Sequence, residues 1–144
     1  EIRVMGRTAS GVRGIDLGDG KAVDCEIANT DDQVLVVTEN GYGKKTSINE
    51  YRMTHRGSKG VKGLNVTEKN GNIVACKTLN DENKDLMVIT DNGIIIRLPL
   101  DQVSSTGRVA QGVRLINLKD NQKVSTVAIV DKVEEISNEN VTEE

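Results

Sequence analysis

Short apolar runs alternate along the chain with polar segments rich in glycine. Two of these runs, residues 33–38 and 85–90, lie about one repeat apart, and each leads into an acidic residue followed by Asn-Gly. Asn-Gly favours the positive φ angles of a tight turn, so each run predicts the first strand of a β-hairpin. Residues 42–48 and 94–100 are the expected return strands. Pro99 cannot donate a ladder hydrogen bond, so we expect it at a sheet edge or a strand end.

Each predicted hairpin is followed at a fixed distance by a glycine motif, since Gly41 to Gly60 and Gly93 to Gly112 are both 19 residues. Behind the motif, alternating apolar residues predict a third strand, and a polar turn leads to a fourth. The fourth strands are expected at residues 22–28, 73–79 and 124–130. No stretch of about 10 residues keeps a helical period, so we predict an all-β fold of blade-like repeats of about 50 residues, with about two and a half units present.

The composition agrees with thin strands rather than one thick core. Tyr42 and Tyr51 are the only aromatic residues, so the core must come from aliphatic side chains, many of them β-branched. Cys25 and Cys76 fall in similar strand-like contexts, and we expect both to be buried, reduced thiols. No apolar run approaches the roughly 20 residues of a membrane span, so we expect a soluble, cytoplasmic protein with no membrane partner.

The net charge of −3 divides into two parts of opposite sign. Residues 131–144 carry six acids and one lysine, a net of −5, which leaves 18 Lys/Arg and 16 Asp/Glu, or +2, in residues 1–130. We therefore expect residues 1–130 to form the folded part and residues 131–144 an acidic, disordered tail. Such a tail either competes for an anion-binding surface or only aids solubility. Because the first residues match the end of a unit, we expect the chain to be part of a longer protein.

The glycine motif is most basic in the middle unit, where residues 55–63 contain three Lys or Arg, three glycines and no acid. Related segments occupy residues 6–14 and 107–114. Glycine-rich turns let backbone N–H groups approach an anion closely, and Arg and Lys add charge-assisted hydrogen bonds. The sequence therefore predicts a phosphate-contacting loop in every unit.

Cations recur at two positions of the motif in all three units, and we predict that they form a basic stripe along one rim. The first position holds Arg7, Arg56 and Arg108, and the second holds Arg13, Lys62 and Arg114. Further cations expected around the middle unit are Lys44, Lys45, Arg52 and Lys59. The loop glycines of the predicted site are Gly11, Gly57, Gly60, Gly63 and Gly112. The alternative is that the cations are merely solvated and that the blade turns require the motif glycines Gly6, Gly11, Gly60, Gly107 and Gly112.

The scarcity of aromatic residues indicates which nucleic acid this stripe would bind. Proteins that bind single strands stack the bases on aromatic side chains, and two tyrosines make a poor platform. Duplex DNA held by its phosphates, without base readout, fits better. Lys and Arg contacts along a curved rim would also bend the duplex, as in proteins that wrap DNA.

Little in the chain points to catalysis. There is no G-x-x-x-x-G-K-[ST] loop, and residues 41–45 form a hairpin turn with cations, so nucleotide hydrolysis is not indicated. His55 has no orienting carboxylate at a suggestive spacing, and we expect it on the surface beside the anion site. A single histidine leaves no Cys/His spacing for zinc. We therefore expect no catalytic residue, metal or cofactor in this chain.

Several linked segments resemble the C-terminal domain of the DNA gyrase A subunit. They are VLVVTENGYGKK at residues 34–45, EYR at 50–52, RGSKGVK at 56–62 and GRVAQGVRL at 107–115. The resemblance covers about residues 2–130, which is nearly everything except the acidic tail.

This resemblance implies a six-bladed β-pinwheel, a propeller-like disc whose neighbouring blades exchange strands and whose basic perimeter wraps duplex DNA. Residues 1–130 are then a partial pinwheel. The parent is implied to be an ATP-dependent type II topoisomerase that introduces negative supercoils, an A2B2 gyrase complex of A and B subunits that uses ATP and Mg²⁺. Strand passage takes place elsewhere in such a parent, so neither Tyr42 nor Tyr51 is its nucleophile.

One motif departs from the family pattern. The gyrase box QRRGG(R/K)G is matched by residues 54–60 at only four of seven positions, which implies a later blade with a degenerate copy. Two other functions stay open at this point. The related subunit of topoisomerase IV has similar blades, and a propeller-type interaction module would instead bind an acidic partner.

Overall fold

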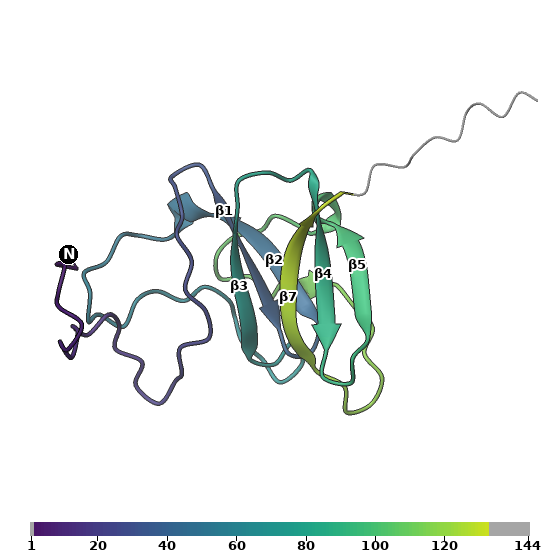
Figure 1. Ribbon diagram of the computed structural model, residues 1–144. Coiled ribbons are helices and arrows are strands. Elements are labelled where there is room, and N and C mark those ends of the chain that lie inside the picture. The colour runs from purple at the N-terminus through teal and green to yellow at the C-terminus, as the bar shows by residue number, and fades with distance from the viewer. Residues whose placement is uncertain (1, 133–144) are drawn as a thin grey trace, which may run out of the picture.

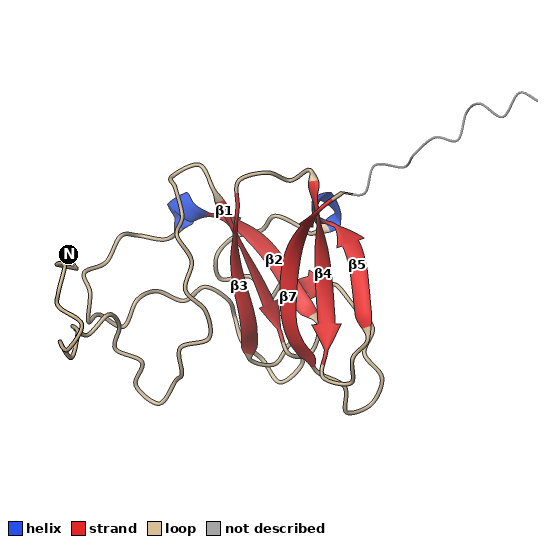
Figure 2. Cartoon of the chain, viewed as in Figure 1, coloured by secondary structure: helices blue, strands red, loops and turns tan. Residues whose placement is uncertain are grey.

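Two antiparallel sheets contain every strand in the described part of the chain, residues 2–132 of the computed structural model (Figure 1). The first sheet has the order β3-β1-β2-β6, with β1 at Gln33–Thr38, β2 at Tyr42–Ser47, β3 at Ile73–Leu79 and β6 at Val113–Arg114. The second has the order β5-β4-β7, with β4 at Lys84–Thr90, β5 at Ile95–Pro99 and β7 at Val124–Asp131. The helices described are two 3-10 turns, η1 at Ile48–Glu50 and η2 at Leu100–Gln102 (Figure 2). The all-β prediction is confirmed.

The hydrophobic core lies between the two sheets and is aliphatic. Leu35 and Val37 of β1 pack there with Leu86 and Val88 of β4, and all four side chains are fully buried. Burying one such side chain stabilises the fold by about 1.5–3 kcal/mol. The other face of β1 packs in a smaller cluster around Leu64. Because β1 is buried on both faces, its sequence is a continuous apolar run rather than an alternating one.

Both predicted hairpins are present, but their turns differ from the expectation. Gly41 and Gly93 have φ of 80° and 83°, whereas neither Asn40 nor Asn92 has a positive φ. Each glycine N–H donates to the carbonyl of the threonine three residues before it, at 3.0 and 3.1 Å. The loops are therefore three residues long, with only the glycine in the left-handed region. Pro99 is the last residue of the edge strand β5, as predicted.

The two sheets are joined by an exchanged strand. By sequence β6 belongs to the repeat that forms the second sheet, yet it pairs with β2 of the first, with Gly43 opposite Val113. Gly112 makes this approach possible, because it has φ of 81° and a Cβ there would lie 2.8 Å from the Gly43 carbonyl oxygen. Exchange of strands between neighbouring units is therefore part of this fold.

Residues 2–32 form no strand, which differs from the strand expected at 22–28. β3 and β7 each pair with the first strand of their own unit, and these residues include no such strand. The segment instead lies along β3, where Lys77 Nζ contacts Asp24 at 3.0 Å and Glu26 at 2.7 Å. Cys25 is consequently exposed, so its predicted burial is wrong, and Cys76 is partly buried.

Both thiols are free. Within residues 2–132 no helix is long and apolar enough to cross a membrane. Most of the expected acidic tail, residues 133–144, lies outside the described part of the chain.

Candidate nucleic-acid interface

The three glycine motifs form a row of adjacent loops, which we call the first (6–14), second (54–63) and third (107–114) motif loops. Beside the first and second loops, Asp16 N donates to Ser58 O at 2.8 Å. At the equivalent repeat positions beside the second and third loops, Asn65 N donates to Ala110 O at 3.3 Å. The same backbone contact therefore links each loop to the next.

A glycine in the left-handed region gives the three loops a common shape. Gly11, Gly60 and Gly112 occupy the same repeat position, and their φ angles are 81°, 73° and 81°. The second loop has one more such residue, Gly57, with φ of 76°, and its N–H donates to Gly14 O at 2.7 Å. A side chain at these positions would be strained, so the residue type is fixed by the backbone.

Six of the ten predicted cations are exposed on or near the first and second motif loops. They are Arg7, Arg13, Arg52, Arg56, Lys59 and Lys62. Arg13 also pairs with Asp16 at 2.6 Å, but its side chain remains 67% exposed. An open hollow of about 480 Å³ lies between the first and second loops, and both Arg56 and the exposed His55 line it.

The two cations of the third motif loop are engaged in contacts within the protein. Arg108 donates from its backbone N–H to Glu50 Oε2 at 2.7 Å and from its guanidinium to the carbonyl of Lys62, which ties the third loop to the second. Arg114 donates to the Tyr42 hydroxyl at 2.9 Å, and its guanidinium lies 5.5 Å from the centre of that ring. Arg108 therefore ties the third loop to the second, and Arg114 ties β6 to β2.

Lys44 and Lys45 do not lie on the surface, which is a correction to the predicted stripe. Lys44 is fully buried, and its Nζ donates to the carbonyl of Gly107 at 2.7 Å and to that of Arg108 at 2.5 Å. Burial lowers the pKa of Lys44. Lys45 is 3% exposed and pairs with Glu82 at 2.7 Å. Neither ammonium group is placed to contact a phosphate, because each is already enclosed by protein oxygens.

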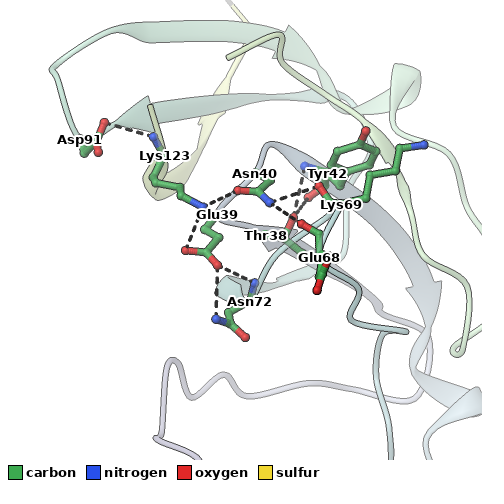
Figure 3. Close-up of polar contacts among 9 residues, drawn as sticks. All are labelled: Thr38, Glu39, Asn40, Tyr42, Glu68, Lys69, Asn72, Asp91 and Lys123. Atoms are coloured by element: carbon green, nitrogen blue, oxygen red, sulfur yellow. Dashed lines mark hydrogen bonds and ion pairs between the residues drawn. The ribbon is translucent and has the colours of Figure 1, made fainter. Parts of the chain in front are cut away.

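A polar cluster at the first hairpin contains contacts that the sequence did not indicate (Figure 3). Lys123 Nζ donates to Asn40 Oδ1 at 2.6 Å and lies 3.6 Å from Glu39 Oε2. Glu39 also accepts from the backbone N–H of Asn72 at 3.0 Å. The backbone N–H of Lys123 donates to Asp91 Oδ1 at 3.2 Å, so this lysine joins the hairpin turns of both units.

Cys76 in β3 has a partly buried thiol. Burial raises the pKa of Cys76 to about 11, so this thiol stays protonated at neutral pH. Among residues 2–132 no group of three or more His, Cys, Asp or Glu is placed to hold a metal ion.

The two sheets are blade-like and exchange a strand, and the motif loops of successive units lie in a row. This arrangement is typical of a propeller-type array. The family of the DNA gyrase C-terminal domain, a β-propeller, matches residues 1–29, 32–80 and 84–131, and the chain belongs to this family. The three matched segments coincide with the three repeat units, and the resemblance in the motifs is confirmed.

Two Staphylococcus aureus proteins show how close the relationship is. The chain is 52% identical over 141 residues to the DNA gyrase A subunit of strain MRSA252, which covers 96% of this chain and 16% of the relative. It is 54% identical over 132 residues to the DNA gyrase A subunit of strain NCTC 8325, covering 90% and 15%. The chain therefore spans about one sixth of the length of these relatives.

Solved structures share the fold at lower sequence identity. A DNA gyrase A C-terminal domain superposes with a TM-score of 0.76 at 24% identity, over 90% of this chain and 44% of that one. A topoisomerase IV C-terminal domain gives a TM-score of 0.81 at 22% identity, over 90% and 41%. At these identities the likeness establishes the architecture alone.

Proposed function

We propose that this chain binds duplex DNA across the row of motif loops and bends it, as part of the DNA-wrapping domain of a gyrase A subunit. The observation that carries the proposal is the row itself. Backbone hydrogen bonds join each loop to the next, and the first two loops present exposed cations. Each loop is thereby suited to a separate stretch of phosphate backbone.

The described surface favours a duplex over a single strand. Tyr42 is 8% exposed and already packs against Arg114, and Tyr51 is partly buried, so neither ring is available for stacking bases. Loop N–H groups and long cationic side chains recognise phosphates without reading the bases. We therefore expect affinity that depends on salt and little on sequence.

In the parent protein the wrap would present a DNA segment to a strand-passage core during ATP-dependent negative supercoiling. That core, ATP, Mg²⁺ and the gyrase B subunit of an A2B2 complex belong to the larger assembly, which would act in the cytoplasm. Support comes from the relatives, which are DNA gyrase A subunits. Because this chain corresponds to about one sixth of their length, the strand-passage core would lie in another part of such a protein. The chain itself would bind and orient DNA without catalysing a reaction.

The test replaces Arg56, Lys59 and Lys62 by Ala together and measures duplex binding across a series of salt concentrations. Log affinity should fall linearly with log salt for both proteins, and the variant slope should be shallower by about 0.9 for each phosphate contact that the substitutions remove. An unchanged slope would sink the proposal.

A matched control keeps the effect of net charge separate. Lys84, Lys119 and Lys132 lie outside the motif loops, and replacing all three by Ala removes the same formal charge. This control should retain most of the salt slope. Equal flattening by both variants would mean that overall charge, rather than the row of loops, binds the DNA.

A further inference from the structure

A hollow of about 220 Å³ lies at the end of the third motif loop, and we call it the Tyr42 hollow. Tyr42 is the first residue of β2, Lys69 lies in a turn that follows the second motif loop, and Arg114 is the last residue of β6. Tyr42 and Lys69 belong to the middle unit and Arg114 to the third. The lining of the hollow therefore comes from two successive units of this chain.

The Tyr42 ring brings these two cations together. Lys69 Nζ lies 5.7 Å from the centre of the ring, and the guanidinium carbon of Arg114 lies 5.5 Å from it. Cations beside an aromatic ring are attracted by the negative charge of its π system. Figure 3 shows the Lys69 side chain extending past this ring. Because Tyr42 is buried, its ring is a fixed support for two positive charges.

The turn that carries Lys69 is also held in place. Asn40 Nδ2 donates to the carbonyls of Glu68 and Lys69, both at 3.2 Å (Figure 3). Asn40 Oδ1 accepts from Lys123 Nζ at 2.6 Å, which fixes the orientation of the amide. The Lys69 backbone is therefore positioned before any ligand binds.

Neither cation of the hollow is neutralised by a carboxylate in the described part of the chain. Arg114 donates to the Tyr42 hydroxyl from Nη2 at 2.9 Å and from Nε at 3.3 Å, and to Asn117 Oδ1 from Nη1 at 3.2 Å. These acceptors are neutral, and they use three of the five guanidinium N–H groups. Every ion pair found within residues 2–132 involves other side chains. The hollow therefore has two uncompensated positive charges.

The Tyr42 hydroxyl completes a set of hydrogen-bond donors. Its oxygen accepts two N–H groups of Arg114, so its own proton can be donated to a ligand. An ammonium, a guanidinium and a phenolic O–H then line one hollow. Such donors match the oxygens of a phosphate, which accept hydrogen bonds and carry negative charge.

The third unit does not repeat this arrangement. Ile94 follows Gly93 there, as Tyr42 follows Gly41 in the middle unit. Ile94 has neither a ring nor a hydroxyl, so it cannot orient two cations. The hollow is therefore distinct from the glycine loop that all units share, and Lys69 lies outside the predicted basic stripe.

We propose that Tyr42, Lys69 and Arg114 form a phosphate site that continues the DNA path at the end of the third motif loop. The occupant is a phosphate of the duplex backbone, so this inference rests on the proposed function. Arg108 donates from its guanidinium to the Lys62 carbonyl, and the cations of the Tyr42 hollow supply the positive charge at this end of the row. A backbone that follows the row meets the hollow after the second loop.

The first test measures the salt dependence of duplex binding for Lys69→Gln in the 144-residue chain. The slope of log affinity against log salt should become shallower by about 0.9, because one phosphate contact is removed. Lys119→Gln is the matched control, since Lys119 is exposed, carries the same charge and does not line the hollow. This control should keep the wild-type slope. Equal flattening by both variants, or no flattening by Lys69→Gln, overturns the proposal.

Tyr42→Phe tests the hydroxyl separately from the ring. Phenylalanine keeps the aromatic face but removes the oxygen that orients Arg114 and the proton that would reach the phosphate. Duplex affinity should fall about threefold to tenfold, the effect of one hydrogen bond. The salt slope should stay close to wild type, because no charge is lost. Thermal melting checks folding, and a folded variant with wild-type affinity contradicts the proposal.

A parallel measurement separates this proposal from the function on which it rests. If replacing Arg56, Lys59 and Lys62 by Ala flattens the slope and Lys69→Gln does not, DNA follows the motif loops without contacting the Tyr42 hollow. The phosphate site is then wrong and the proposed function stands. If neither variant flattens the slope, the proposed function fails and the phosphate site fails with it.

Nuclear magnetic resonance distinguishes the DNA backbone from free phosphate. In a nitrogen-15-labelled chain, the Arg114 Nε–H signal should shift when duplex is added, and Lys69→Gln should reduce this shift. Inorganic phosphate at the same phosphate concentration should leave the signal in place, because a single anion lacks the contacts along the loops. An equal shift with inorganic phosphate overturns the assignment to the DNA path, and no shift with duplex overturns the site.

Discussion

The glycine at one position of the repeat is required for different reasons in different loops. Gly11 and Gly112 both have φ of 81°. Nothing lies within 4 Å of a Cβ built on Gly11, whereas a Cβ on Gly112 would lie 2.8 Å from the Gly43 carbonyl oxygen. At Gly11 the requirement is conformational, and at Gly112 it is both conformational and steric.

This difference predicts unequal costs for one substitution. Gly11→Ala should lower the free energy of unfolding by about 1–2 kcal/mol, the cost of a left-handed residue with a side chain. Gly112→Ala should cost about 1–3 kcal/mol more, because the methyl group also pushes β6 away from β2. Urea denaturation followed by circular dichroism measures both values. Equal losses at the two positions would contradict the close packing at Gly112.

Exposure of individual cations was only partly predictable from the sequence. Arg56, Lys59 and Lys62 lie on an exposed loop, where a glycine-rich segment without acids is expected to lie. Lys44 and Lys45 look equally solvent-exposed in the sequence, but they lie in β2, where Glu82 and carbonyls of residues 100–108 enclose both ammonium groups. A hint was available, because the third unit has Ile96 at the position of Lys44.

At the scale of elements, strands were predictable where their partners are close in the chain. The β1–β2 and β4–β5 hairpins follow from an apolar run, a turn and a return strand, all of which are local. Residues 22–28 have a similar pattern but form no strand, and side-chain contacts with Lys77 place them along β3 instead. The pairing of β6 with β2 joins two units and could be expected only from the family resemblance.

Lys44 supports the segment that leads into β6, the strand that pairs with β2. This contact leads to a second prediction. Its ammonium group donates to the carbonyls of Gly107 and Arg108, so it holds the segment that leads into β6. Lys44→Met keeps the aliphatic stem but leaves these two oxygens without their donor. We expect a loss of about 1–3 kcal/mol in the free energy of unfolding.

The control for this prediction is an exposed lysine of the neighbouring loop. Lys59→Met removes the same charge at an exposed site and should change stability by no more than about 0.5 kcal/mol. Hydrogen exchange adds a local measurement, because amides of residues 104–110 should lose protection in Lys44→Met. Protection that stays at the wild-type level would show that Lys44 does not hold this segment.

At the scale of the whole molecule, the repeat places equivalent loops in a row by repeating one contact. Asp16 with Ser58 and Asn65 with Ala110 are the same hydrogen bond one unit apart. Each loop thus has a fixed place relative to the next, and a phosphate backbone that follows the row meets the loops in order. A path made in this way should bind DNA through several separate contributions rather than one central site.

Separate contributions should be additive, and this can be measured with one variant in each of two loops and their combination. Arg7→Ala with Arg13→Ala removes the cations of the first motif loop, and Arg56→Ala with Lys62→Ala removes the equivalent cations of the second. Each pair should flatten the dependence of log affinity on log salt by up to about 1.8, at 0.9 per phosphate contact, and the four-fold variant should show the sum. Additivity is expected because the loops contact different phosphates. If the first pair has no effect while the second removes all salt dependence, DNA binds at one loop and the row is not its path.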